Sequence, residues 1–132
     1  VFFLFQMITI EIQTSDAERL RGFDMALLRP AMAKSVLLLE SKMKKYPSPP
    51  AGSRYRRTGT LGRRWTHTVS SGSNSLEGKI GNSTSYGPFV QSQAMQAQVH
   101  KGRWLTDEQA LNESVPAITG FFDNTINEVL GG

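Results

Sequence analysis

Arginine is the residue type whose concentration in this chain points most directly to chemistry. Residues 46–65 read YPSPPAGSRYRRTGTLGRRW and contain no acidic residue. Guanidinium groups bind phosphate and carboxylate oxygens through paired hydrogen bonds, and interleaved aromatic rings can stack on nucleic-acid bases. The segment therefore predicts a surface for an anionic partner, built from five arginines and two rings: Arg54, Arg56, Arg57, Arg63, Arg64, Tyr55 and Trp65.

The basic stretch extends beyond this segment. Between Ser41 and Leu76 the chain has eight Lys or Arg and no Asp or Glu, a local charge of +8, whereas the whole chain is only +4. The remaining 7 basic and 11 acidic residues therefore sum to −4. Three interpretations stay open at this point: the stretch binds nucleic-acid phosphates, it docks on an acidic protein surface, or it is a solvated loop that keeps the protein soluble.

Residues typical of enzyme sites are scattered. His67 and His100 lie far apart in the sequence, and neither has the spacing of a metal-ligand motif. Asp107 and Glu108 fit the first turn of a helix, where acids favour the helix dipole. The segment Gly59-Thr60-Leu61-Gly62 is not followed by the Gly-Lys-Ser/Thr of a phosphate-binding loop. We predict a protein that is not an enzyme and that uses no cofactor or metal.

Length and composition fit one domain. The 132 residues are 39% hydrophobic and 20% charged, and the chain has no cysteine, which excludes disulfides and thiolate metal sites. The apolar start VFFLFQMITIEI lacks a basic leading region and is shorter than the roughly 20 residues of a membrane-spanning helix. We therefore expect no membrane partner. Because Met7 follows this start, residues 1–6 can be read as an extension upstream of the natural first residue.

Hydrophobic periodicity predicts an α+β domain over residues 1–132. The expected fold is a small antiparallel sheet covered on one face by two principal helices, with a long basic Pro/Gly loop at residues 46–60. Alternation predicts a strand at residues 7–13 and a hairpin whose arms are residues 61–70 and 76–80. We expect a helix at residues 16–45 that Ser15 and Glu18 cap and Pro30 kinks or splits, a short helix within 89–99, and a final helix from the cap Thr106 to about residue 130.

Two segments of the chain resemble a known family. The run from Tyr55 to Trp65, centred on Arg57-Thr58-Gly59-Thr60-Leu61, is similar to the Arg-Thr-Gly-x-Leu signature of bacteriophage tail-component proteins. These are the small tail-completion or head–tail joining proteins of tailed phages. The run from Asn82 to Val90 is similar to the segment that follows the hairpin in that family, and a region with His100, Gly102 and Trp104 precedes the closing helix. The resemblance covers roughly residues 16–130.

The resemblance implies a structural virion protein, assembled in the host cytoplasm and located at the head–tail junction or tail end. The expected partners are further copies of the chain in a ring (a hexamer, or a dodecamer), neck or adaptor proteins, tail-tube proteins and passing DNA. The alternative is a small basic nucleic-acid-binding protein that uses the same arginines. The residues expected to contact a neighbouring subunit or partner are Arg54, Tyr55, Arg56, Arg57, Thr58, Gly59, Leu61, Arg63, Arg64, Tyr86, Phe89 and Trp104.

Overall fold

The computed structural model describes residues 6–16, 18–48, 52 and 59–131. Its strands are β1 (Gln6–Gln13), β2 (Trp65–Ser71) and β3 (Ser75–Asn82), and its helices are α1 (Arg29–Met43), α2 (Thr60–Arg63), α3 (Gly87–Gln91) and α4 (Asp107–Gly131). Short 3₁₀ turns lie at Thr14–Asp16, Glu18–Leu20, Met25–Leu28 and Gln98–His100. The α+β class predicted from the sequence is confirmed.

The three strands form one antiparallel sheet in the order β1-β3-β2. Ile8 pairs with Ile80 and Ile12 pairs with Leu76, so apolar side chains share one face of the sheet, as alternation predicts. The hairpin between β2 and β3 turns through residues 72–74, where the sequence predicts a turn. Its first strand begins at Trp65 rather than at residue 61, because residues 60–63 form the helical turn α2.

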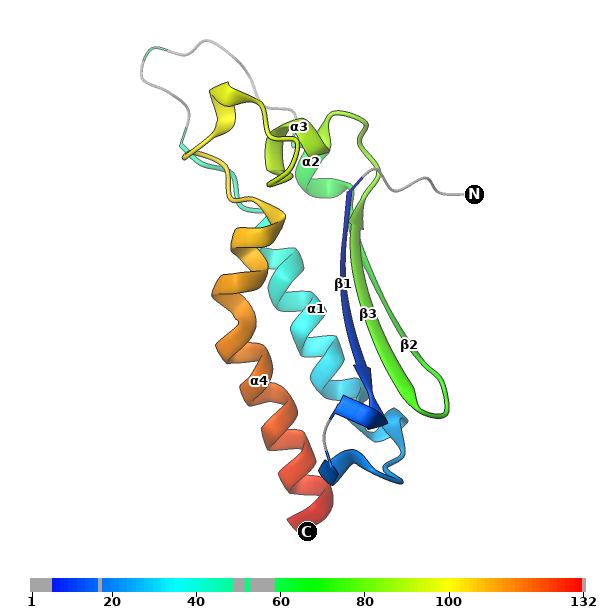
Figure 1. Cartoon of the computed structure of the whole chain (residues 1–132). Coiled ribbons are helices and arrows are strands. Elements are labelled where there is room, and N and C mark those ends of the chain that lie inside the picture. The colour runs from blue at the N-terminus through cyan, green and yellow to red at the C-terminus, as the bar shows by residue number, and fades with distance from the viewer. Residues whose placement is uncertain (1–5, 17, 49–51, 53–58, 132) are drawn as a thin grey trace.

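The long helices lie on the apolar face of the sheet (Figure 1). Helix α1 packs on β2 and β3, and α4 packs along α1. One core joins these layers, and its fully buried members include Leu28, Met32, Leu39, Leu76 and Ile80. Helices α2 and α3 lie together at the end of the molecule where α1 stops and α4 begins, away from the β2–β3 turn (Figure 1). The sheet and the long helices therefore form a frame, and the candidate site is built at one end of it.

The helix expected over residues 16–45 begins much later. Residues before Arg29 form separate 3₁₀ turns, and Gly22 has a φ of 71°, a left-handed conformation that interrupts a helix. The Asp24 carboxylate accepts a hydrogen bond from the Ala26 amide and starts the third turn. Pro30 lies in the first turn of α1, where the missing amide hydrogen costs nothing. The proline therefore starts the helix instead of kinking it.

Helix α4 starts at the predicted cap. The Gln109 amide donates to Thr106 Oγ1 at 3.2 Å, and the Thr106 amide donates to Gln109 Oε1 at 3.0 Å. This reciprocal pair is a capping box that the sequence contains and our prediction missed. The helix continues through Pro116 to Gly131. Over the described residues, no helix combines the length and apolar character needed to cross a membrane.

Gly78 on the central strand sets how closely α1 approaches the sheet. A Cβ atom at this position would lie 2.6 Å from both Met32 Sδ and Val36 Cγ1. We predict that Gly78→Ala lowers the free energy of unfolding by about 1–3 kcal/mol, because α1 must shift outward. Chemical denaturation measures this, with Gly120→Ala as the matched control: nothing lies within 4 Å of its new methyl group, and in a helix it should stabilise by about 0.5–1 kcal/mol. Equal stability of Gly78→Ala and wild type would contradict the packing described.

Candidate functional site

The arginine-rich segment enters the described structure at Gly59. This residue has a φ of 77°, a left-handed conformation that favours glycine. Residues Thr60–Arg63 then form α2, and β2 follows from Trp65. The chain therefore turns at Gly59 into a helical turn rather than directly into the strand.

Leu61 and Trp65 are both buried and belong to different cores, so Trp65 does not offer the stacking ring that the sequence suggested. Trp65 is 2% exposed within the main core, whereas Leu61 packs with Val90 and Trp104 in a separate cluster, against which Tyr46 lies. The Tyr46 and Trp104 rings have centroids 5.0 Å apart and are tilted by 59°. Residues of two separate cores therefore hold the end of the arginine-rich segment.

Asn82, at the end of β3, joins these parts through hydrogen bonds. Its side chain is fully buried, and Nδ2 donates to the Leu61 carbonyl at 2.8 Å. Its Oδ1 accepts from the Thr84 amide at 2.8 Å and from the Thr84 hydroxyl at 2.5 Å. A Cβ on Gly87 would approach Thr84 Oγ1 to 2.8 Å and Leu61 Cδ1 to 3.4 Å. The two segments that resemble the phage family therefore contact each other directly at this point.

Glutamine side chains hold the surrounding loops, a role that sequence reasoning missed. Gln96 Nε2 donates to three backbone carbonyls, those of Val90, His100 and Trp104, at 2.7–3.3 Å. Gln91 is fully buried, and its Nε2 donates to the Met43 carbonyl at 3.0 Å. The helix found in this region, α3, ends at Gln91, because the backbone of Ser92 is extended, with φ −90° and ψ 127°. The glutamine side chains satisfy backbone carbonyls in the loop that follows.

Gln6 belongs to the same network. It is 5% exposed, begins β1, and donates from Nε2 to the Gln91 carbonyl at 2.9 Å and to Asp107 Oδ2 at 3.3 Å. The upstream extension considered from the sequence therefore does not lie wholly outside the fold, because its last residue is buried in it.

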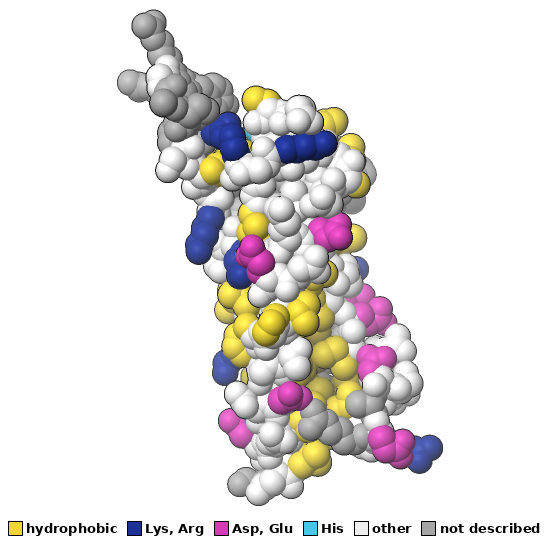
Figure 2. Space-filling model, turned by 60° about the vertical axis from the view of Figure 1, so that its left-hand side comes forward, with side chains coloured by type: hydrophobic (Ala, Val, Ile, Leu, Met, Phe, Trp, Pro, Cys, Tyr) yellow, Lys and Arg dark blue, Asp and Glu magenta, His cyan; other side chains and the backbone are white. Residues whose placement is uncertain are grey.

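Cations gather at this end of the molecule, which we call the basic pole and define by the exposed or half-exposed residues Lys44, Lys45, Arg63, Arg64, Lys101 and Arg103. The three segments that contain them are tied together. The Gly62 amide donates to Tyr46 Oη at 2.8 Å, and Arg103 Nη2 reaches the Ser48 carbonyl at 3.4 Å. Figure 2 shows Lys and Arg side chains at the upper end of the face along α4. Burial lowers the pKa of the neighbouring His100, and the positive charge of Arg103 lowers it further.

The other predicted contact residues divide into three groups. Tyr86 and Phe89 are 47% and 51% exposed, so both offer apolar surface next to the basic pole. Leu61 and Trp104 are 5% and 8% exposed; packed inside the molecule, they position the segment and offer little surface to a partner. Arg54, Tyr55, Arg56, Arg57 and Thr58 lie outside the described residues.

A charged cluster fixes β2 to the end of α1. Glu40, with a side chain 10% exposed, pairs with the His67 ring and with Lys44 Nζ, the latter at 2.7 Å. Burial raises the pKa of Glu40, but hydrogen bonds and charge from Lys44 and His67 outweigh it, so the pKa is lowered overall. His67 therefore serves on the sheet as a hydrogen-bonding partner of Glu40.

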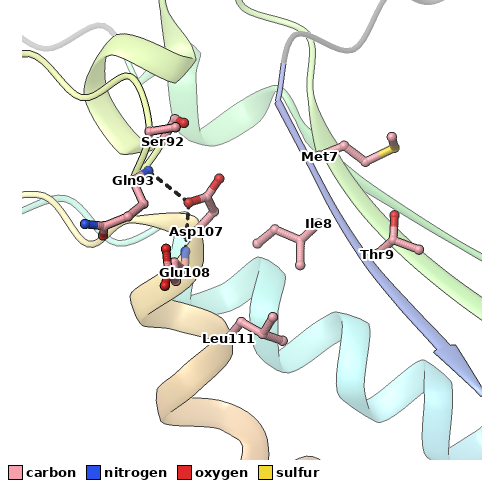
Figure 3. A pocket seen from close by; sticks show the side chains of 9 residues that line it. Met7, Ile8, Thr9, Ser92, Gln93, Asp107, Glu108 and Leu111 are labelled. Atoms are coloured by element: carbon pink, nitrogen blue, oxygen red, sulfur yellow. Dashed lines mark hydrogen bonds between the residues drawn. The ribbon is translucent and has the colours of Figure 1, made fainter.

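A groove separates β1 from the first turns of α4 (Figure 3). It has a volume of about 380 Å³ and is lined by Met7, Ile8, Thr9, Ser92, Gln93, Ala94, Asp107, Glu108 and Leu111. Its polar rim is held in place, since Asp107 Oδ1 accepts from the Gln93 amide at 3.0 Å and from the Glu108 amide at 2.7 Å. Within the described ranges, no three His, Asp or Glu side chains lie close enough to bind a metal ion together.

Comparison of the chain with protein-family models, curated proteins and solved structures found no match. The resemblance to phage tail-component proteins stays a prediction.

We predict that Asn82→Ala lowers the free energy of unfolding by about 2–4 kcal/mol, because it leaves the Leu61 carbonyl and the Thr84 donors without partners. Limited trypsin digestion should also cleave faster after Arg63 and Arg64, since the strand end no longer holds α2. Asn112→Ala, at an exposed position of α4, is the matched control and should change neither measurement appreciably. Unchanged cleavage in Asn82→Ala would contradict the role of Asn82.

The Glu40 cluster makes stability depend on pH. A carboxyl whose pKa is lowered on folding stabilises the protein above its unfolded pKa, and this stabilisation is lost as the pH falls through its folded pKa. We predict that Glu40→Gln costs about 1–3 kcal/mol at pH 7, and that the difference from wild type shrinks below about pH 4. Denaturation midpoints across this range test it. Glu113→Gln is the control, because its ion pair with Lys42 is half exposed and should contribute little.

Proposed function

We propose that this chain is a structural subunit of a tailed bacteriophage virion that acts at the head–tail junction or tail end as part of a closed homo-oligomeric ring. The observation that supports this proposal most is the contact between the two segments that resemble the phage family. Leu61 from the first segment and Asn82 and Gly87 from the second are in contact. A resemblance that rests on two separate segments gains weight when those segments form one structural unit.

The basic pole gives this proposal a contact surface. Arg63 and Arg64 are exposed, and the exposed Tyr86 and Phe89 lie in the neighbouring segment. Cationic and aromatic side chains around a well-packed base are typical of protein interfaces. The neighbours proposed for this surface are the neck and tail-tube proteins, with non-specific contact to passing DNA where arginines line a channel. The proposed role is non-enzymatic.

The corresponding prediction concerns assembly of particles. In a host that produces the virion, Arg63→Glu/Arg64→Glu should reduce the yield of joined, infectious particles at least about tenfold, since opposite charge at an interface is replaced by like charge. The double reversal Lys34→Glu/Lys79→Glu, away from the basic pole, is the matched control. Electron microscopy with an antibody to the chain should label the head–tail junction or tail end. Absence of the chain from purified virions would overturn the proposal.

The second candidate is a small nucleic-acid-binding protein, which the gathered cations of the basic pole favour. It predicts binding that weakens steeply with salt, and each lost phosphate contact should reduce the slope of log K against log salt by about 1. Arg63→Ala/Arg64→Ala should then weaken binding to all sequences equally. Fluorescence anisotropy with a labelled duplex decides: a salt-insensitive or absent signal counts against this candidate.

A further inference from the structure

Strand β1 has an open edge. The Thr14 amide donates to the Asn74 carbonyl at 2.9 Å, which continues the register in which Gln13 pairs with Ser75. Hydrogen-bonded and non-bonded pairs alternate along an antiparallel ladder, so the even-numbered residues of β1 bond to β3. The odd-numbered residues turn their N–H and C=O groups outward. Gln13 uses its outward amide to bind Asp16 Oδ2 at 2.8 Å, whereas Met7, Thr9 and Glu11 direct theirs away from every described strand.

Strand β2 forms the other edge of the sheet, and the same reasoning applies to it. The Gly72 amide donates to the Ser75 carbonyl at 2.9 Å, so even-numbered residues of β2 bond to β3 and odd-numbered ones face outward. Arg29 confirms this alternation, because its Nη2 donates to the outward Val69 carbonyl at 3.2 Å. The backbone groups of Trp65 and His67 point outward in the same way.

The two edges match only when they pair in parallel. On β1, the residues whose backbone groups point outward have side chains that face solvent, as Thr9 does. On β2, the residues whose backbone groups point outward have side chains that face the helices, as Trp65 does. In a parallel ladder each outward residue bonds to the two neighbours of the residue opposite it. Parallel pairing of β1 with another copy's β2 therefore keeps all helices on one side of a continuous sheet.

Apolar surface flanks both edges. On the β1 side, Leu111, Val115 and Ile118 form one row along α4, and the groove at β1 exposes its upper part. Figure 2 shows apolar side chains gathered midway along this face. On the β2 side, Arg29 and Glu40 both contact β2, and Leu37 lies on the same side of α1 and is 52% exposed.

Corresponding residues of the two edges lie at the same height. Thr9 and Thr68 both pair with Lys79, and Glu11 and Ser70 both pair with Glu77. Parallel pairing without displacement along the strands therefore places Thr9 beside Thr68 of the next copy, and Glu11 beside Ser70, with all four side chains on the solvent face of the sheet. An alignment of this kind is compatible with closure into a ring.

We propose that the open edge of β1, together with the α4 row beside it, binds the β2 edge of a second copy of this chain in parallel, and that repetition of this contact closes the ring. The inference rests on the proposed ring function and identifies the surfaces that form it. The two-fold alternative, β1 against β1, would leave the β2 edge unused and would give a closed dimer rather than a ring.

Cysteine cross-linking tests the contact directly, because the chain has no cysteine. Thr9 and Thr68 both pair with Lys79 and both face solvent, so they should be neighbours across the interface. Within one copy they are two strand spacings apart, about 9–10 Å, beyond the roughly 7 Å that a disulfide can span. Mild oxidation of Thr9→Cys/Thr68→Cys should give a ladder of covalent oligomers on a denaturing gel. Thr9→Cys/Ser73→Cys, with the second thiol in the exposed turn, should give none.

A proline substitution provides an independent test. The substitution Thr9→Pro removes the amide hydrogen that Thr9 directs away from β3, so native mass spectrometry should show ring formation weakened at least about tenfold. The ladder between β1 and β3 does not use this amide, so circular dichroism should show an unchanged fold. Thr9→Val, which keeps the amide at the same position, is the matched control and should assemble like the wild type. Normal assembly of Thr9→Pro would contradict the contact.

The outcomes separate this inference from the proposed function. Covalent dimers from Thr9→Cys alone, with no larger species from Thr9→Cys/Thr68→Cys, would establish the two-fold contact and overturn the inference. Rings in the virion that Thr9→Cys/Thr68→Cys fails to cross-link would also overturn it while leaving the function intact. A ladder in solution from a chain that is absent from virions would support the interface and remove the proposed function.

Discussion

Close packing of α1 against the centre of β3 is the constraint on which the rest of the structure depends. Gly78 has no side chain where Met32 and Val36 meet the sheet, and the fully buried residues of α1 follow from that contact. Strand β3 is hydrogen-bonded to β1 on one side and to β2 on the other. Helix α1, which packs on β3, is therefore held at a fixed height relative to both edge strands. The end of α1 then determines where the basic pole begins and where α4 can pack.

The basic pole depends on polar contacts far more than the main core does. Among the described residues, its apolar cluster has three buried members, and hydrogen bonds from Asn82, Gln91 and Gln96 to backbone carbonyls hold the loops around it. Buried amide side chains of this kind stabilise one arrangement strongly, since any other arrangement leaves them unpaired. A small core with fixed polar partners can therefore present Arg63 and Arg64 at a defined position on a single helical turn.

Strands, the hairpin and the helix cap could be predicted from hydrophobic periodicity and capping residues, whereas the contacts made by side-chain hydrogen bonds could not. The strand with Ile8, Ile10 and Ile12, the hairpin and the cap at Thr106 were all predictable, because apolar alternation and capping residues act locally. The start of α1 was mispredicted because a proline that breaks a helix also suits a first turn. The glutamine contacts could not be predicted, since their acceptors lie far along the chain: the Met43 carbonyl is 48 residues from Gln91, and the Gln91 carbonyl is 85 residues from Gln6. The signal available in the sequence was the concentration of four glutamines in residues 89–99.

The basic residues that make the charge of the sequence uneven lie at one end of the molecule. Strands and long helices run roughly parallel, so the basic pole and the β2–β3 turn occupy opposite ends (Figure 1). If copies join edge to edge without displacement along the strands, every basic pole lies on the same rim of the ring. The arginines then act collectively, and their field on one rim is several times that of a single copy. A rim of this kind favours an acidic neighbour stacked on one side only, so lateral assembly would by itself give the ring the polarity that a junction between two different structures needs.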